Sequence, residues 1–270
     1  MDTLTLRHPP SQPSLQPIVK WPGGKRWILP HIEPLWDRHR GSRLVEPMAG
    51  GLAVALGLAP DHATLNDINP HLINLYRQVR DGLTLDRRME NDEAFYYAAR
   101  AEFNARTRSG DFASPESAQL FYYLNRTGYN GLCRFNSKGE YNVPFGQYSK
   151  ITYGRDLDCH ARMFARWEFT CGDFAAITLS PGDFVYADPP YDVEFTKYSQ
   201  NDFVWDDQVR LAHWLASHDG PVALSNQATP RILDLYERLG FAIRLLAGPR
   251  RISCTGDRDP AREVLATRGL

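Results

Sequence analysis

The stretch DFVYADPPYD, residues 183–192, ends an apolar run with an acid, two prolines and an aromatic ring. Each proline lacks a backbone donor and fixes φ at about −65°, and the residue before each proline avoids the helical region. Asp188, Pro189, Pro190 and Tyr191 are therefore a rigid segment that fixes a carboxylate and a ring at the end of a strand. Adjacent prolines are also common in loops, so the tetrapeptide alone indicates either a prearranged site or a strand-terminating turn.

A second candidate site lies in LVEPMAGG, residues 44–51. Glycines after a strand let the backbone approach a ligand, and the next helix N-terminus adds a favourable field. Asp67 ends the next predicted strand, where dinucleotide-type folds place the acid that binds ribose hydroxyls. The segment lacks G-x-G-x-x-G and a phosphate loop, which favours a ligand with a nucleoside but no pyrophosphate. The alternative is an αβ turn with an acid that caps a helix.

A third glycine pair lies upstream, in VKWPGGKRW, residues 19–27. Its backbone, beside Trp21 and Lys25, could bind a carboxylate. An ordinary basic turn has the same composition, so this segment alone decides nothing.

The composition bounds the protein class. A chain of 270 residues with 43% hydrophobic and 12% aromatic residues predicts a packed core and no membrane span. Residues 1–17 are rich in Pro and Ser, lack the apolar region of a secretion signal, and predict a flexible leader. The 4 cysteines and 8 histidines lack metal-ligand spacing. We therefore expect no structural metal, reduced thiols and a cytoplasmic protein.

Apolar runs bounded by Gly, Pro or Asp predict buried strands at 43–46, 63–67, 183–188, 221–225, 241–246 and 263–267. Helical spacing is present between them, at 70–80 with Asn69 as N-cap, at 206–218 and at 229–239. This alternation favours a doubly wound α/β sheet.

The middle of the chain, residues 82–165, interrupts that alternation. Two helical stretches, 92–106 and 115–126, precede a run rich in Gly, Asn and Tyr, in which Gly139 suits a hairpin turn and 141–145 a return strand. From Arg100 to Arg166 there are ten Lys or Arg against six Asp or Glu, so a polyanion would meet this segment. A surface hairpin without a partner is the alternative.

Together these motifs resemble the Dam-type DNA adenine-N6 methyltransferases. The resemblance spans about Lys20 to Thr267 and rests on KWPGGK, EPMAGG, NDIN, YLNRTGYNGLCRFNSKGEYNVPFGQY, ADPPY and RRIS. It implies a Rossmann-like methyltransferase sheet formed by 18–81 and 166–270. It also implies an inserted, mainly helical target-recognition domain, 82–165, that bears a β-hairpin.

The resemblance further implies S-adenosylmethionine as methyl donor. Its methionine end would lie beside Trp21, Lys25, Glu46, Met48 and Gly50, its ribose at Asp67, its adenine at Asp173 and Phe174, and its methyl group near Asp188. The carboxylate of Asp188 and the carbonyl of Pro189 would accept hydrogen bonds from the target amine, and Tyr191 would stack on the flipped base.

Six residues match positions that contact bases or occupy the opened duplex in GATC-specific relatives: Lys20, Tyr129, Asn130, Arg134, Pro144 and Tyr148. The resemblance thus implies methylation of adenine in GATC within double-stranded DNA. We take a monomer as the default, and no obligate protein partner is evident from the sequence. Three residues depart from the family pattern: Gln147 replaces a common Arg, Met48 an aromatic, and Leu52 a glycine. An RNA adenine methyltransferase and a catalytically silent DNA-binding homologue are the alternative functions.

Overall fold

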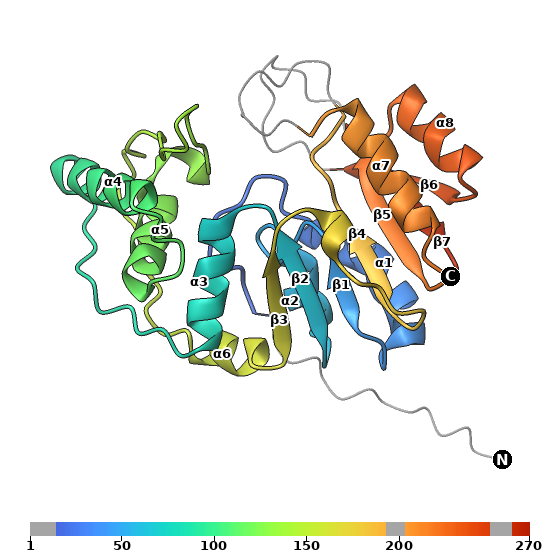
Figure 1. Ribbon diagram of the computed structural model, residues 1–270, viewed down its shortest axis with the longest axis horizontal. Coiled ribbons are helices and arrows are strands. Elements are labelled where there is room, and N and C mark those ends of the chain that lie inside the picture. The colour runs from blue at the N-terminus through green and yellow to red at the C-terminus, as the bar shows by residue number, and fades with distance from the viewer. Residues whose placement is uncertain (1–14, 193–202, 249–260) are drawn as a thin grey trace.

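The computed structural model describes residues 15–192, 203–248 and 261–270, and its centre is a seven-stranded sheet (Figure 1). The strands, in chain order, are β1 Leu44–Glu46, β2 Ala63–Asp67, β3 Trp167–Cys171, β4 Phe184–Ala187, β5 Val222–Gln227, β6 Ala242–Gly248 and β7 Ala261–Arg268. Their spatial order is β3-β2-β1-β4-β5-β7-β6. Strand β7 pairs antiparallel with both of its neighbours, β5 and β6, and the other neighbouring strands of the described sheet pair in parallel. The doubly wound α/β fold is therefore confirmed.

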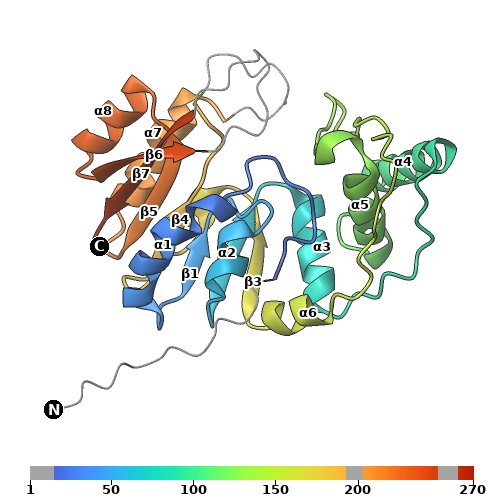
Figure 2. The same cartoon turned by 180° about the vertical axis from the view of Figure 1, so that it is seen from behind.

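Helices cover both faces of this sheet, as Figure 2 shows from behind. On one face lie α1 Leu29–Trp36, α2 Ala53–Leu58, α3 Pro70–Arg80 and α6 Asp158–Phe164, and on the other α7 Trp205–Ala216 and α8 Pro230–Arg238. Successive strand residues point to opposite faces of the sheet. In β4, Tyr186 packs with the first helix layer (α1, α2, α3 and α6), while Val185 and Ala187 pack with the second (α7 and α8). This two-sided burial explains the nearly continuous apolar runs in the sequence.

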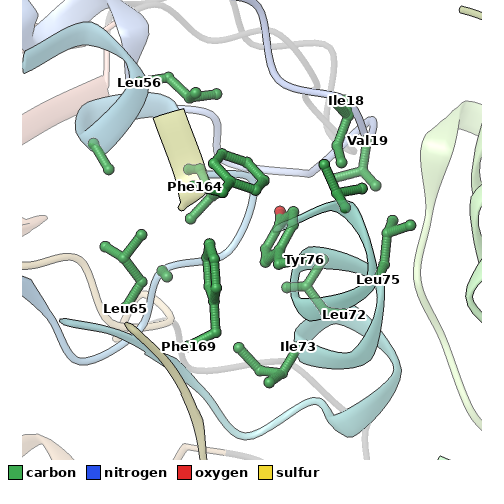
Figure 3. Close-up of a cluster of buried hydrophobic side chains, with 14 of the residues drawn as sticks. Ile18, Val19, Leu56, Leu65, Leu72, Ile73, Leu75, Tyr76, Phe164 and Phe169 are labelled. Carbon is green, nitrogen blue, oxygen red and sulfur yellow. The ribbon is translucent and has the colours of Figure 1, made fainter. Parts of the chain in front are cut away.

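The first of these layers is centred on Tyr76 of α3 (Figure 3). Its ring lies 5.9 Å from the ring of Phe164 in α6 and 5.5 Å from that of Phe169 in β3, between ring centroids. Each such buried ring contributes about 1.5–3 kcal/mol. The Tyr76 hydroxyl donates to the carbonyl of Gly50 at 2.7 Å, so the same side chain joins the core to the turn after β1.

The inserted segment contains α4 Glu93–Arg108 and α5 Pro115–Thr127. Helix α5 packs against both α4 and α3, and the apolar core of this segment is continuous with that of the sheet. Helix α6, at the end of the predicted 82–165 domain, packs instead on α3 and β3. The division of the chain at these boundaries stays a prediction.

Helix α3 begins and ends at the residues that the sequence predicts. The side chain of Asn69 accepts hydrogen bonds from the backbone N–H groups of His71 and Leu72, which confirms it as the N-cap, a role worth about 1 kcal/mol. The predicted strands and the other predicted helices are present with boundaries shifted by a few residues.

Sequence periodicity missed β3, α1, α2 and α6. Strand β3 is an edge strand with exposed Glu168 between buried Trp167 and Phe169, so it has no continuous apolar run. Within the described residues there are also four short 3₁₀ helices: η1 Arg26–Ile28, η2 Asp37–His39, η3 Tyr129–Gly131 and η4 Phe174–Ala176.

The predicted hairpin is present only as a tight turn with isolated pairing. Gly139 has φ +74°, and its N–H donates to the carbonyl of Asn136 at 2.9 Å. Tyr141 and Phe145 make one bridge each, so the return strand expected over 141–145 is not regular. Of the predicted leader, residues 1–14 lie outside the described residues, while Leu15 packs against the core. The RRIS motif, residues 250–253, also lies outside them.

Candidate active site

Three acidic residues end neighbouring strands of the sheet: Glu46 ends β1, Asp67 ends β2, and Asp188 follows β4. Since these strands are parallel, their carboxyl ends meet at one edge. The strand order reverses between β1 and β4, the topological switch point at which open α/β sheets bind ligands. The fold thus brings together the carboxylates of three separate sequence motifs.

The turn after β1 is built around glycine. Gly50 has φ +46°, and a Cβ there would lie 2.8 Å from Nε1 of Trp21. A Cβ at Gly51 would lie 2.9 Å from Cβ of Trp21. The indole of Trp21 therefore lies directly on this turn, and no side chain fits beneath it. Leu52, at which the resemblance leads us to expect glycine, adopts φ +60°, a conformation that glycine takes without strain.

Asp67 supports the same turn from the other side. Its Oδ2 accepts the Gly50 N–H at 3.0 Å, and its Oδ1 accepts the Asn69 N–H at 2.9 Å. Burial raises the pKa of Asp67, while the backbone N–H groups of Asn69, Gly50 and Ile68 oppose that shift. Ile68 is 60% exposed beside this carboxylate. Sequence reasoning missed it, although an apolar residue directly after a strand-ending acid was a usable signal.

Lys25 is the cation of the site and is only 5% exposed. Its Nζ lies 3.0 Å from Oδ1 of Asp188 and donates to the hydroxyl of Tyr191 at 2.6 Å. It also lies 4.0 Å from Oε2 of Glu263 in β7. Sequence reasoning missed Glu263, because nothing in β7 marks it as a motif. One buried ammonium thus faces two carboxylates and a phenol.

The DPPY segment is fixed along its length. Ser225 Oγ donates to Oδ1 of Asp188 at 2.8 Å, and Gln208 Nε2 donates to the carbonyl of Pro190 at 2.7 Å. Directly after Tyr191, the carboxylate of Asp192 accepts hydrogen bonds from Thr229 and Arg231. The prearranged-site reading is therefore favoured over a plain strand-terminating turn.

The electrostatics of Asp188 and Glu46 are set by burial. Burial raises the pKa of Asp188, whereas the charge of Lys25 and the hydrogen bond from Ser225 lower it. Burial raises the pKa of Glu46 to about 8, with a further contribution from the charge of Asp188, against a hydrogen bond from the Ala55 N–H. Oε1 of Glu46 is buried without a hydrogen-bond partner among the described residues.

The remaining predicted cofactor residues, Met48, Asp173 and Phe174, differ in their burial and in the side chains that contact them. Met48 is half-buried against the second helix layer. Phe174 is buried, and the guanidinium of Arg210 lies 4.2 Å from its ring centroid. The same Arg210 binds both oxygens of Asp173, at 2.7 and 2.8 Å. In this structure Asp173 and Phe174 therefore face an arginine that sequence reasoning did not foresee.

Five of the six predicted DNA residues form one surface, defined here as the recognition face: Lys20, Tyr129, Asn130, Pro144 and Tyr148. Lys20 Nζ lies 3.9 Å from the ring centroid of Tyr148, whose hydroxyl donates to the carbonyl of Gly128 at 3.2 Å. The N–H of Tyr129 donates to the carbonyl of Pro144 at 2.9 Å. Tyr129 is 49% exposed, and Asn130 beside it has φ +51°.

The sixth residue, Arg134, lies in the adjoining turn. Its Nε donates to Oδ1 of Asn142 at 2.7 Å, and its Nη2 donates to the carbonyl of the same residue at 3.3 Å. The turn also contacts the N-cap of α3, since Asn69 Nδ2 lies 3.4 Å from Sγ of Cys133. The candidate base-reading residues and the ribose-binding candidate Asp67 are thus connected through one asparagine.

Neither a metal centre nor a membrane span emerges from the described part of the chain. Within residues 15–192, 203–248 and 261–270, no group of three or more His, Cys, Asp or Glu could bind a metal ion. No helix in those ranges is long and apolar enough to cross a membrane.

Comparison with known proteins gives consistent matches. The model of the D12 class of N6 adenine-specific DNA methyltransferases matches residues 21–247. The retron Ec67 DNA adenine methylase of Escherichia coli is 36% identical over 93% of this chain and 91% of its own length. The type II methyltransferase M1.LlaDCHI of Lactococcus lactis subsp. cremoris is 35% identical over 83% and 85%. The DNA adenine methylase of Escherichia coli strain K12 is 35% identical over 92% and 94%.

Proposed function

Since this chain belongs to the D12 class of N6 adenine-specific DNA methyltransferases, we propose that its methyl donor is S-adenosylmethionine and that its target is a flipped-out adenine in GATC. The observation that carries the proposal is the rigid DPPY segment at the topological switch point, with its carboxylate paired to a buried lysine. Class membership makes the chain an adenine-N6 methyltransferase of DNA, and the proposal adds the donor, the sequence and the residues.

Several groups of the site support the choice of this donor. Glu46 offers a buried carboxyl oxygen without a partner, and a buried acceptor of this kind suits the amino group of the methionine moiety. Asp67 would accept hydrogen bonds from the ribose hydroxyls, and the exposed Ile68 beside it would contact the adenine. When bound, S-adenosylmethionine supplies an electrophilic methyl group on a sulfonium. Trp21, Lys25, Met48 and Gly50 would surround its methionine end, and Arg210 would release Asp173 for its adenine.

The target amine is a poor nucleophile, because its lone pair is delocalised into the purine ring. Asp188 and the carbonyl of Pro189 would accept its two protons in hydrogen bonds and so favour a pyramidal nitrogen. The prolines, the Ser225 hydrogen bond to Asp188 and the Gln208 hydrogen bond to the carbonyl of Pro190 restrain this segment before the base arrives, which would reduce reorganisation during transfer. Tyr191 would stack on the base and offset part of the few kcal/mol lost on unstacking.

The recognition face and Arg134 would read the duplex. Tyr129 is exposed and aromatic, as suits a ring that occupies the space of an extruded base. Lys20 and Tyr148 pair through a cation–π contact beside it. Arg134 would leave Asn142 to form a bidentate contact with guanine. The assignment of GATC rests on the resemblance of these residues to those of GATC-specific relatives.

Methyl transfer from labelled S-adenosylmethionine to short duplexes tests the proposal. One duplex contains GATC, a second has the four bases scrambled, and a third substrate is an RNA of equal length. We expect label on the GATC adenine alone. Label on both duplexes would refute the sequence assignment, and label on the RNA alone would refute DNA as the substrate.

A further inference from the structure

Ser225 lies in β5 beside β4, and its side chain is fully buried. Its Oγ lies 2.8 Å from Oδ1 of Asp188, 3.0 Å from the hydroxyl of Tyr186 and 3.5 Å from the carbonyl of Ala187. The carboxylate is the closest and the only charged acceptor. A hydroxyl has one proton to donate. When Ser225 donates to Asp188, Tyr186 is therefore the donor to Ser225, and the three side chains form one directed chain of hydrogen bonds.

The two carboxylate oxygens of Asp188 are consequently not equivalent. Oδ1 receives both the Ser225 hydrogen bond and the ammonium of Lys25, at 2.8 and 3.0 Å. No side chain or backbone N–H of the described residues donates a hydrogen bond to Oδ2. A carboxylate oxygen accepts about two hydrogen bonds, so Oδ1 is saturated while Oδ2 keeps its capacity.

We infer that Ser225 is a positioning residue for methyl transfer, because its hydrogen bond to Oδ1 fixes the plane of the Asp188 carboxylate and leaves Oδ2 to accept the target amine. The inference rests on the proposed function, since Oδ2 matters to the reaction only if Asp188 accepts that amine. Ser225 itself would touch neither the base nor the methyl donor.

The same hydrogen bond bears on the ionisation of Asp188. A carboxyl group must be ionised to accept with both oxygens, and burial raises the pKa of Asp188, against which Ser225 and Lys25 act. Loss of the Ser225 hydroxyl therefore moves this pKa further upward. The titratable groups that face Asp188 come from several elements: Lys25, Glu46, Tyr186, Tyr191, Tyr236 and Glu263. Ser225→Ala removes none of them.

The test is Ser225→Ala, assayed with a GATC duplex between pH 5 and 9. We expect kcat to fall about ten- to hundredfold, the loss of one hydrogen bond to a charged group, with KM for DNA and donor nearly unchanged. We also expect the acid limb of kcat/KM to move to higher pH. A merely structural role for Ser225 would lower activity without moving that limb.

The matched control is Ser117→Ala in α5. Ser117 is equally buried, and its hydroxyl also donates to a carboxylate, Oδ2 of Asp111, at 2.8 Å. We expect this variant to keep the wild-type pH profile. If both variants shift the acid limb alike, or if Ser225→Ala leaves it in place, the inference is overturned.

Two further variants separate the remaining outcomes. If Ser225→Ala fails to fold, Ser225→Cys takes its place, because a thiol has a similar volume but is a weak hydrogen-bond donor. An acid limb that is not shifted in Ser225→Cys would overturn the inference. Asp188→Asn tests the proposed function by itself. Full activity of Asp188→Asn would refute the proposed role of Asp188. An inactive Asp188→Asn beside a wild-type-like Ser225→Ala would refute only the role of Ser225.

Discussion

Lys25 and Asp188 form an ion pair in which Nζ lies 3.0 Å from Oδ1, and the two side chains are 6% and 19% exposed. A second carboxylate, that of Glu263, lies 4.0 Å from the same Nζ. One cation therefore balances two acids at the centre of the candidate site. Breaking a buried pair from one side is costly, because the remaining charge is left without a partner.

This arrangement predicts coupled stabilities for Lys25 and Glu263. Lys25→Gln should lower the free energy of unfolding by about 3–5 kcal/mol, since it leaves two buried acids unbalanced. Adding Glu263→Gln should restore part of the loss. The double variant should therefore lose less free energy of unfolding than the two single variants lose together. Urea unfolding of the wild type, the two single variants and the double variant measures these free energies as a double-mutant cycle. The exposed pair Arg40–Asp37 is the control and should give about 1 kcal/mol or less. Additivity within the Lys25–Glu263 cycle would contradict the prediction.

Glu46 predicts a pH dependence of donor binding. Burial raises the pKa of Glu46 to about 8, so at neutral pH the free protein holds this group protonated. A cationic amino group beside it would lower that pKa and release the proton. Affinity for S-adenosylmethionine should therefore rise with pH up to about pH 8, and binding should release protons at pH 7.

Calorimetry in buffers of different ionisation enthalpy counts these protons. The variant Glu46→Gln should bind more weakly and lose the pH dependence. Proton release of equal size from Glu46→Gln would show that another group is responsible.

The turn after β1 predicts that Gly50 tolerates no side chain. Gly50→Ala combines a positive φ with a Cβ 2.8 Å from the indole nitrogen of Trp21, so Trp21 must move. We expect a loss of stability of about 2–4 kcal/mol and weaker donor binding. Gly110, φ +80° with nothing within 4 Å of an added Cβ, is the matched control. Gly110→Ala should cost only about 1 kcal/mol and leave donor binding unchanged. Equal effects of the two changes would rule out the clash with Trp21 as the cause.

Arg134 predicts a change in sequence discrimination. Arg134→Ala should relax the preference for guanine by about 1–3 kcal/mol, because the proposed bidentate contact would be lost. The readout is the ratio of kcat/KM for GATC and for duplexes substituted at one guanine. Lys138→Ala, an exposed cation in the same turn, should weaken binding to all duplexes alike. Unchanged preference in Arg134→Ala would remove Arg134 from base reading.

His71 predicts acid sensitivity of the fold. Burial lowers the pKa of His71 to about 4, and Nδ1 has no hydrogen-bond partner among the described residues. The unfolded chain binds the proton at about pH 6.5, so stability falls as pH drops from about 6.5 to 4 and levels off below. The contribution is on the order of 3 kcal/mol. Urea unfolding of His71→Leu should show a smaller loss between pH 7 and 4.5 than wild type. The exposed His62→Ala should keep the wild-type loss.

The sequence predicts the parts of the site that lie within one motif. Glu46 and Asp67 end recognisable apolar strands and Asp188 directly follows one, and parallel strands bring such residues to one edge. Asn69 was predictable as a cap because capping is local. The rigidity of the DPPY segment follows from proline itself.

The partners of these residues were not predictable, because they come from elements without a motif. Ser225, Gln208 and Glu263 reach the DPPY segment through crossovers and through the antiparallel insertion of β7, which periodicity does not reveal. Likewise, Asp173 is paired with Arg210 from a helix that begins much later in the chain. Pairing over such distances depends on the fold.

The apolar core is continuous between the sheet and the inserted segment, which limits how new specificities could arise if that segment reads DNA as proposed. His71 of α3 stacks on Phe135 of the turn and lies against Phe103 of α4 and Phe121 of α5, with ring centroids 4.6–6.0 Å apart. Helix α3, which packs on the sheet, thus also forms part of the apolar core of the inserted segment. Grafting a foreign recognition segment onto this scaffold would require the facing side of α3 to be transplanted with it, so under the proposed function specificity would be inherited together with part of the catalytic core.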